Sequence, residues 1–229
     1  MAADEASAPL PDPIDGPLGL AQCLCARLCH DIAGSLGALL ASLELAGEQA
    51  GPAQGTAEEA IALAGDTGRT LVARLRLLRA AWAGNDAPLD LPSLLDLAQG
   101  LSARRVRLDL SQLPPETVFP PAAGQVVLNL VLLAAEALPA GGSIWFDQAA
   151  EGDLLIGAAG PESAWPEGLA AALAGDVRIV GPRELQAPLT VLLARAAGFG
   201  LSILMPAGPS PPPGAPPLLL DFGAGAASP

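Results

Sequence analysis

The sequence predicts an N-terminal antiparallel helical hairpin followed by an α/β sandwich. Two long segments carry apolar residues at helical spacing, and glycine and proline at residues 51, 52 and 55 separate them. After residue 84, short apolar runs typical of strands alternate with helical segments. We therefore expect a flexible N-terminus over residues 1–16, a helical hairpin over 17–84, an α/β domain over 85–205 and a disordered proline-rich tail over 206–229.

Composition argues against several classes of protein. Hydrophobic residues make up 51% of the 229 residues, enough for a folded core, and the net charge of −13 argues against nucleic-acid binding. The N-terminus has no apolar leader, and no run of about 20 consecutive apolar residues is present to span a bilayer. The cysteines Cys23, Cys25 and Cys29 cluster on one predicted helix, which is no disulfide framework. We expect a soluble, cytoplasmic protein without a membrane span or a metal site.

The first helix is predicted from about residue 18 to residue 49. Its apolar residues form one stripe, made of Leu24, Leu28, Ile32, Leu36, Leu39 and Leu43. His30, the single histidine of the chain, lies roughly opposite this stripe. The residues one or two turns away are mostly small and would let a partner protein come close. We therefore predict a partner-binding surface made of Ala26, Arg27, Ala33, Gly34 and Gly37.

The second helix is predicted to begin near Thr56. Its apolar residues have heptad-like spacing, at Leu71, Leu75, Leu78 and Trp82. Two long helices joined by a short break form an antiparallel hairpin, which cannot bury both flanks of its apolar stripes alone. Two copies would bury them in a four-helix bundle, so we expect a homodimer.

The rest of the chain predicts helices on one face of a sheet. The expected helices are 91–103, 124–138, 167–174 and 188–197, and the expected strands are 106–110, 143–147, 153–158 and, as the final strand, 200–205. Within the proline-rich tail, residues 217–222 form an apolar island. This island is either a docking motif or a segment that folds back onto the domain.

His30 is the candidate nucleophile of the hairpin. An exposed imidazole can attack with one ring nitrogen near neutral pH while its other nitrogen is held as a donor. Asp31 follows it directly, and a carboxylate there would orient the ring and raise its basicity. The plainer alternatives are a solvated surface histidine and a solvated helix acid. Arg27 is either a contact for a phosphoryl group or partner, or an ordinary surface arginine.

Residues 27–32 (RLCHDI) resemble the phosphoacceptor box of histidine phosphotransferases of the ChpT type. The similarity continues at residues 75–82 (LRLLRAAW) and 128–142 (LNLVLLAAEALPAGG), and with matching order it covers residues 18–205. Members of this family are relatives of histidine kinases, built from a dimerising helical hairpin and a kinase-like ATPase-fold domain. The resemblance implies that His30, assisted by Asp31, accepts a phosphoryl group from one receiver domain and passes it to another.

Three departures separate the chain from the kinases themselves. Ser35 stands where kinases carry a proline that bends the first helix. Leu133 stands at the position of the kinases' magnesium-binding asparagine, and residues 158–161 (AAGP) offer no carboxylate to an adenine ring. We therefore expect a degenerate ATPase-like domain that binds no ATP, and a protein without a cofactor of its own.

The resemblance also implies the partners. The donor would be the receiver domain of a hybrid histidine kinase (CckA-like), and the acceptors would be response regulators (CtrA-like and CpdR-like). Mg²⁺ would be supplied by the partner receiver domain. Two alternatives stay open on the sequence: a non-catalytic dimeric adaptor that binds signalling proteins, and an active histidine kinase.

Overall fold

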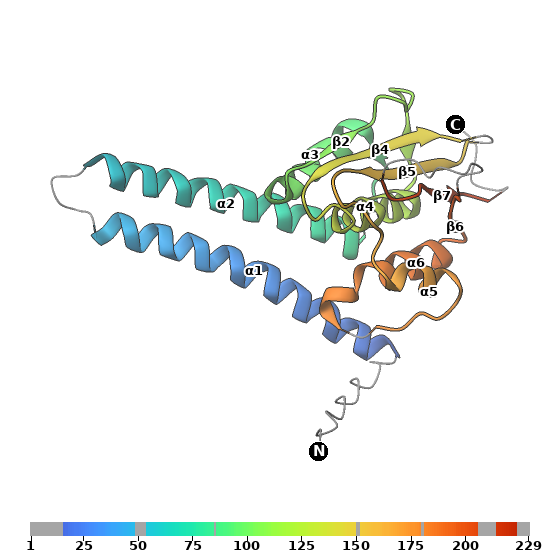
Figure 1. The fold of residues 1–229 in the computed structure, drawn as a ribbon, viewed down its shortest axis with the longest axis horizontal. Helices are drawn as coiled ribbons and strands as arrows, with labels where there is room; N and C mark the ends of the chain where they lie inside the picture. The colour runs from blue at the N-terminus through green and yellow to red at the C-terminus, as the bar shows by residue number, and fades with distance from the viewer. Residues whose placement is uncertain are drawn as a thin grey trace, which may run out of the picture.

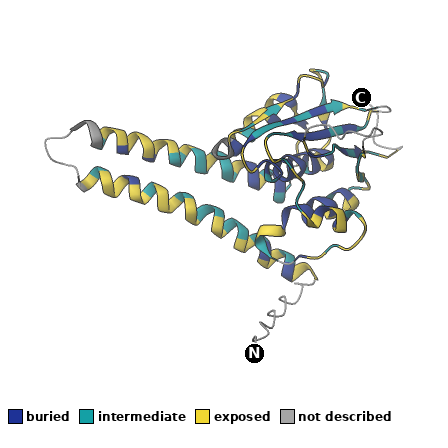
Figure 2. Ribbon diagram, in the orientation of Figure 1, coloured by how far each residue is buried: buried dark blue, intermediate teal, exposed yellow. Residues whose placement is uncertain are grey.

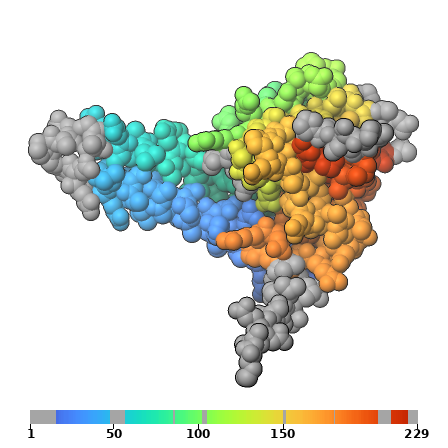
Figure 3. Space-filling model, viewed as in Figure 1, coloured from blue at the N-terminus to red at the C-terminus, as the bar shows by residue number. Residues whose placement is uncertain are grey.

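The computed structural model consists of a helical arm and an α/β body (Figure 1). It describes residues 16–48, 54–84, 86–149, 152–179, 181–205 and 214–223. The predicted flexible N-terminus therefore lies, except for Gly16, outside the described residues. In the space-filling view the arm projects well beyond the body (Figure 3).

The arm is the predicted antiparallel hairpin of α1 (Gly16–Glu48) and α2 (Gln54–Trp82). Both helices begin two residues before the predicted starts, which is within the usual uncertainty of helix ends. α1 runs unbroken through Ser35, whose hydroxyl donates to the carbonyl oxygen of Asp31 at 3.3 Å. The site of the kinases' proline is therefore an ordinary helical turn.

The apolar stripe of α1 is wider than α2 alone covers. Leu24, Leu28, Ile32 and Leu39 are half-buried, whereas Leu36 is 42% and Leu43 47% exposed. Most of the arm is exposed while the buried residues gather in the body (Figure 2). An apolar face left open on both helices fits the expectation that a second copy packs there, and dimerisation stays a prediction.

By length and mean hydropathy alone, α1 would qualify as a membrane-spanning helix, although its consecutive apolar runs are short. Within Gly16–Gly47, an 18-residue stretch has a mean hydropathy of 1.3, and 6% of that stretch is buried. Mid-helix Arg27 and Asp31, however, form ion pairs with other elements of the same chain. Charged groups at the centre of a bilayer are costly, so these contacts favour a helix that packs against protein.

The body is built on a five-stranded sheet in the order β2-β4-β5-β7-β6. β2 pairs with β4 in parallel, and the other neighbours are antiparallel. The strands are β2 (Val106–Asp109), β4 (Gly142–Gln148), β5 (Leu154–Ala159), β6 (Gly200–Ile203) and β7 (Leu218–Asp221). The first four match the predicted strands.

The helices of the body meet at α4 (Pro121–Glu136), which contacts β4 and β5 on one side and α2 and α6 on the other. Its residues are buried almost all round, as its strongly apolar sequence predicts. α5 (Gly168–Leu173) and α6 (Gln186–Ala196) correspond to the predicted helices near residues 167 and 188. η3, a 3-10 turn at Pro182–Glu184, leads into α6.

The predicted disordered tail is wrong for Leu218–Asp221, which form β7. β7 lies between β5 and β6 in the sheet. The strand at residues 200–203 is therefore not the final strand of the chain, contrary to the prediction, and it does not pair with β5. Leu218 and Leu220 are fully buried in the core. The burial of these leucines outweighs the proline-rich composition around them, and of the two options for the apolar island the chain takes the fold-back.

The predicted helix 91–103 is split. α3 (Leu91–Ala98) begins at Asp90, whose carboxylate caps the Ser93 amide, and it continues as the 3-10 helix η1 (Gln99–Arg104). At Gly100 a Cβ atom would lie 2.7 Å from the carbonyl oxygen of Ala73. η1 therefore lies directly on α2. The two-residue strands β1 (Leu89–Asp90) and β3 (Val118–Phe119), paired with each other, are too short to predict from periodicity.

A buried polar network joins the arm to the body. Asn129 on α4 donates to the carbonyl oxygen of Ala81 near the end of α2 at 2.7 Å, and it accepts from Gln186 on α6 at 3.0 Å. Thr190 completes the network with a 2.7 Å hydrogen bond to the carbonyl oxygen of Gln186. Because buried polar groups need partners, this network fixes how the hairpin leaves the body.

Candidate functional site

His30 projects from α1 where the arm meets the body. Its side chain is 70% exposed, so the predicted outward position is what the structure shows. Its Nδ1 atom lies 3.6 Å from Oδ1 of Asp31, just beyond hydrogen-bond length. With Nδ1 beside a carboxylate, Nε2 is the ring nitrogen left for chemistry.

Asp31 points into the junction between the helices. Its Oδ2 accepts from Nη2 of Arg74 at 3.2 Å, and its Oδ1 accepts from Nε of Arg27 at 3.4 Å. Burial raises the pKa of Asp31, but the guanidinium groups of Arg74 and Arg27 outweigh it and hold the pKa below its ordinary value. Asp31 is therefore an ionised carboxylate at neutral pH and not a freely solvated helix acid.

Arg27 does not lie on the predicted partner-binding surface. Its side chain is 12% exposed, and its Nη2 donates to Oε1 of Glu136 on α4 at 2.8 Å. Nη1 donates to the carbonyl oxygen of Pro182 at 3.0 Å. These contacts occupy the guanidinium and tie α1 to two elements of the body.

The other four residues of the predicted surface face solvent. Ala26, Ala33, Gly34 and Gly37 are exposed, and a Cβ atom built at either glycine would meet nothing within 4 Å. Nothing in the fold therefore requires glycine at these two helical positions, where each costs about 1 kcal/mol relative to alanine. They leave room for an approaching backbone.

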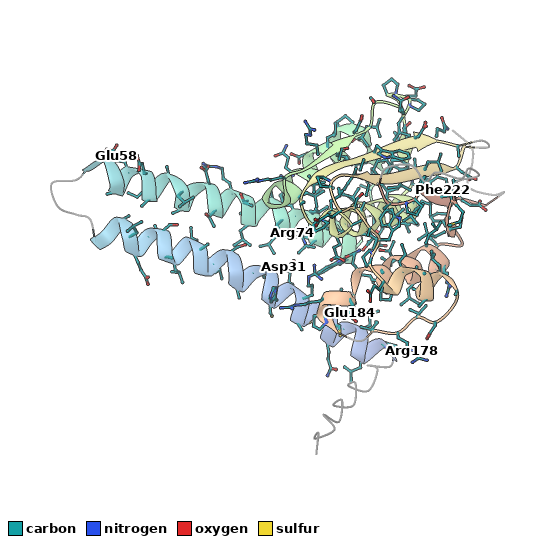
Figure 4. All side chains as sticks on the ribbon, in the orientation of Figure 1. Asp31, Glu58, Arg74, Arg178, Glu184 and Phe222 are labelled. Atoms are coloured by element: carbon teal, nitrogen blue, oxygen red, sulfur yellow. The ribbon has the colours of Figure 1, made fainter. Side chains whose placement is uncertain are left out.

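His30 and Asp31 stand between two hollows. The larger, of about 820 Å³, lies between α1 and the body and is lined by Ala26, Arg27, Glu136, Ala164, Pro166 and residues 181–184. The smaller, of about 270 Å³, lies between α1 and α2 and is lined by Gly34, Ser35, Thr70, Arg74 and Gly100. Figure 4 shows Asp31 and Arg74 on the facing sides of the two helices.

The positions that would serve ATP in a kinase offer it no polar group. Leu133 is fully buried in the core, and Ala158 is buried in β5. Gly160 is packed so closely that a Cβ atom would lie 2.4 Å from the carbonyl oxygen of Gly141. Among the described residues, no group of three or more His, Cys, Asp and Glu side chains could hold a metal ion. That the protein binds no ATP and holds no Mg²⁺ of its own stays a prediction.

Arg74 and Glu136 were not singled out from the sequence. Glu136 had a signal, because it is the single charged residue between positions 121 and 138. An isolated charge in an otherwise apolar helix needs a partner when it is buried, and Arg27 supplies it. Arg74 is one of several arginines on α2, and its pairing with Asp31 depends on the relative rotation of two helices.

Comparison with known proteins shows which protein family the chain belongs to. A family model described as the histidine phosphotransferase C-terminal domain matches residues 93–208, just over half of the chain. The chain belongs to the histidine phosphotransferase family. Its match to the protein phosphotransferase ChpT of Brucella abortus (strain 2308) is 31% identical over 131 residues. That match spans 56% of this chain and 59% of the relative, less than two thirds of its length.

A solved structure has the same fold. A structure described as a bacterial phosphotransferase at 1.7 Å covers 90% of this chain and 96% of its own, with a TM-score of 0.69 and 24% identity. The helical hairpin and the sheet domain of this chain therefore recur together in a known structure. The matched family region begins at Ser93, so His30 and the arm that carries it lie outside that region.

Proposed function

We propose that this protein is a phosphoryl carrier between receiver domains and that His30 carries the phosphoryl group. The observation that supports this most is the position of His30: the single histidine of a histidine phosphotransferase lies exposed beside an ionised aspartate, at the rim of two hollows. A solvated surface histidine would need neither the two arginines around its neighbour nor the small-residue surface beside it.

The chemistry proposed for His30 balances without an added base. The lone pair of Nε2 attacks the phosphorus of a phospho-aspartate, an N–P bond forms, and the P–O bond to the aspartate breaks with its electron pair on the departing carboxylate. The ring keeps its Nδ1 proton and becomes positively charged. The carboxylate of Asp31, 3.6 Å from Nδ1, stabilises that charge. The second transfer reverses these steps on another receiver's aspartate.

The phosphoryl group comes from a protein and not from ATP in this proposal. The residues at positions 133 and 158–161 do not suit a nucleotide, and none of the described side-chain clusters suits Mg²⁺. Mg²⁺ would be supplied by the partner receiver domain. The body then holds α1 in place, and its residues that line the larger hollow would contact the partner.

The proposal includes the proteins that give and receive the phosphoryl group. The donor is the receiver domain of a hybrid histidine kinase of the CckA-like kind, and the acceptors are response regulators of the CtrA-like and CpdR-like kinds. The protein works in the cytoplasm as a homodimer. The exposed leucines Leu36, Leu40 and Leu43 support the dimer, because they continue the half-buried stripe of α1.

The test is label transfer from a radiolabelled phospho-receiver of a hybrid kinase in Mg²⁺, with the parent and His30→Ala side by side. We expect an acid-labile, base-stable label on the parent and none on the variant. Equal labelling of His30→Ala would overturn the proposal. An unlabelled parent that still binds the receiver would favour the non-catalytic adaptor. Labelling by ATP alone would favour an active histidine kinase.

A further inference from the structure

Arg74 reaches the site from the opposite helix. It lies on α2, 43 residues after Asp31 in the sequence, and its Nη2 donates to Oδ2 of Asp31 at 3.2 Å. Both side chains are 17% exposed, so the pair is largely removed from water. An ion pair with this little exposure has a stronger mutual attraction than a surface pair, because solvent screens it less.

The two oxygens of Asp31 have different partners. Oδ2 faces Arg74, while Oδ1 faces both Nδ1 of His30 and Nε of Arg27. A planar carboxylate whose far oxygen is held cannot turn its near oxygen away from the imidazole. The contact with Arg74 therefore restrains the direction in which Oδ1 points.

Arg27 is less suited to this role than Arg74. Its contact to Asp31 is the longer one, at 3.4 Å through Nε. Its Nη atoms donate to Glu136 and to the carbonyl oxygen of Pro182, and these contacts direct the guanidinium toward the body. Among the described side chains, the charged or titratable groups that contact Asp31 are Arg27 and His30 on α1 and Arg74 on α2, and Glu136 on α4 lies behind Arg27.

We propose that Arg74 is a positioning residue for phosphoryl transfer: it holds Asp31 so that Oδ1 keeps the proton of His30 on Nδ1 and leaves Nε2 free to attack. This inference rests on the proposed function for its effect on transfer. The effect on the imidazole itself does not, because the proton's place on the ring is measurable without any receiver.

The single histidine makes the measurement direct. Protein labelled with nitrogen-15 in histidine gives one imidazole in long-range proton–nitrogen spectra, which report the fraction of the Nδ1–H form once the spectrum shows the neutral ring. We expect Arg74→Gln to lower that fraction and to slow phosphoryl acceptance about tenfold or more, because a reacting group that is no longer held in position reacts more slowly. Arg74→Lys should retain part of both.

Arg76→Gln is the matched control. Arg76 lies two residues further along α2 and pairs with Asp96 on an exposed surface, so its loss should leave the imidazole spectrum and the transfer rate unchanged. A second experiment uses the Asp31→Asn variant. If Arg74 acts through Asp31, Arg74→Gln should have no further effect on the tautomer in the Asp31→Asn background.

The outcomes separate the two proposals. An unchanged Nδ1–H fraction in folded Arg74→Gln, or an equal further loss in the Asp31→Asn background, would overturn the role of Arg74. If circular dichroism shows that Arg74→Gln is unfolded, Arg74→Lys replaces it in both backgrounds, the parent and Asp31→Asn. A tautomer shift in a protein whose parent accepts no phosphate would uphold the link between Arg74 and the ring, and would reject both the carrier function and the role in transfer.

Discussion

Arg27 on α1 and Glu136 on α4 form an ion pair of 2.8 Å that joins the phosphoacceptor helix to the α/β body. The side chains are 12% and 17% exposed, and the same guanidinium also donates to the carbonyl oxygen of Pro182. The helix that carries His30 is therefore held by charge as well as by packing.

Glu136→Gln should destabilise the protein. Removing Glu136 from this largely buried pair leaves Arg27 with only the longer ion pair to Asp31. We expect a loss of about 2 kcal/mol in the free energy of unfolding, measured by urea denaturation. Arg76→Gln removes a member of an exposed pair and should cost less than about 0.5 kcal/mol. Equal losses in the two variants would contradict a structural role for the Arg27–Glu136 pair.

Asp31 should make stability depend on acid pH. Its pKa is lower in the folded protein than in the unfolded chain, so its stabilisation is present above about pH 4 and is lost as pH falls through the folded value. The parent should lose stability more steeply than Asp31→Asn as the pH falls below about 4. Parallel curves for the two proteins in urea denaturation across this range would refute the assignment.

Gly34→Ala and Gly37→Ala should separate folding from recognition. Neither new methyl group meets an atom of the fold, so each variant should be more stable by about 1 kcal/mol. If a receiver approaches this surface, the same methyl groups should weaken its binding, which calorimetry would measure. Gly47→Ala is the control, about 15 Å beyond Gly37 on the same helix, and should stabilise without affecting binding.

The exposed apolar face of α1 predicts dimerisation. Leu40→Glu places a charge where we expect a second copy to pack, and it should convert a dimer into a monomer in light scattering. Leu18→Glu, at the other end of the helix and 73% exposed, should leave the dimer intact. A parent protein that is monomeric at micromolar concentration would refute the four-helix bundle.

Much of the fold could be predicted from periodicity because its signals are local. The stripe from Leu24 to Leu43 and the strongly apolar sequence of α4 each lie within one element. Arg27 was misplaced because a helical wheel gives the angle between residues on one helix but not the direction from which another element approaches. The same limit hid Arg74, whose value to the site depends on how α2 lies against α1.

Leu220→Ala tests whether β7, the strand formed within the proline-rich tail, stabilises the sheet. Leu220 is fully buried between β5 and β6, and the substitution should cost about 2–5 kcal/mol of stability. Leu219 alternates to the other face of the strand and is half-buried, so Leu219→Ala should cost less. Similar small losses in both would mean that β7 does not stabilise the sheet.

The place of β7 in the sheet also has a consequence during synthesis. Because the strand that separates β5 from β6 comes after both, a nascent chain that has made residues 154–203 exposes two unpaired strand edges until residue 221 emerges. Unpaired edges recruit other chains, so the interval before the last strand arrives is when the protein is most open to aggregation or to a chaperone. Truncated translation products would remain in that state.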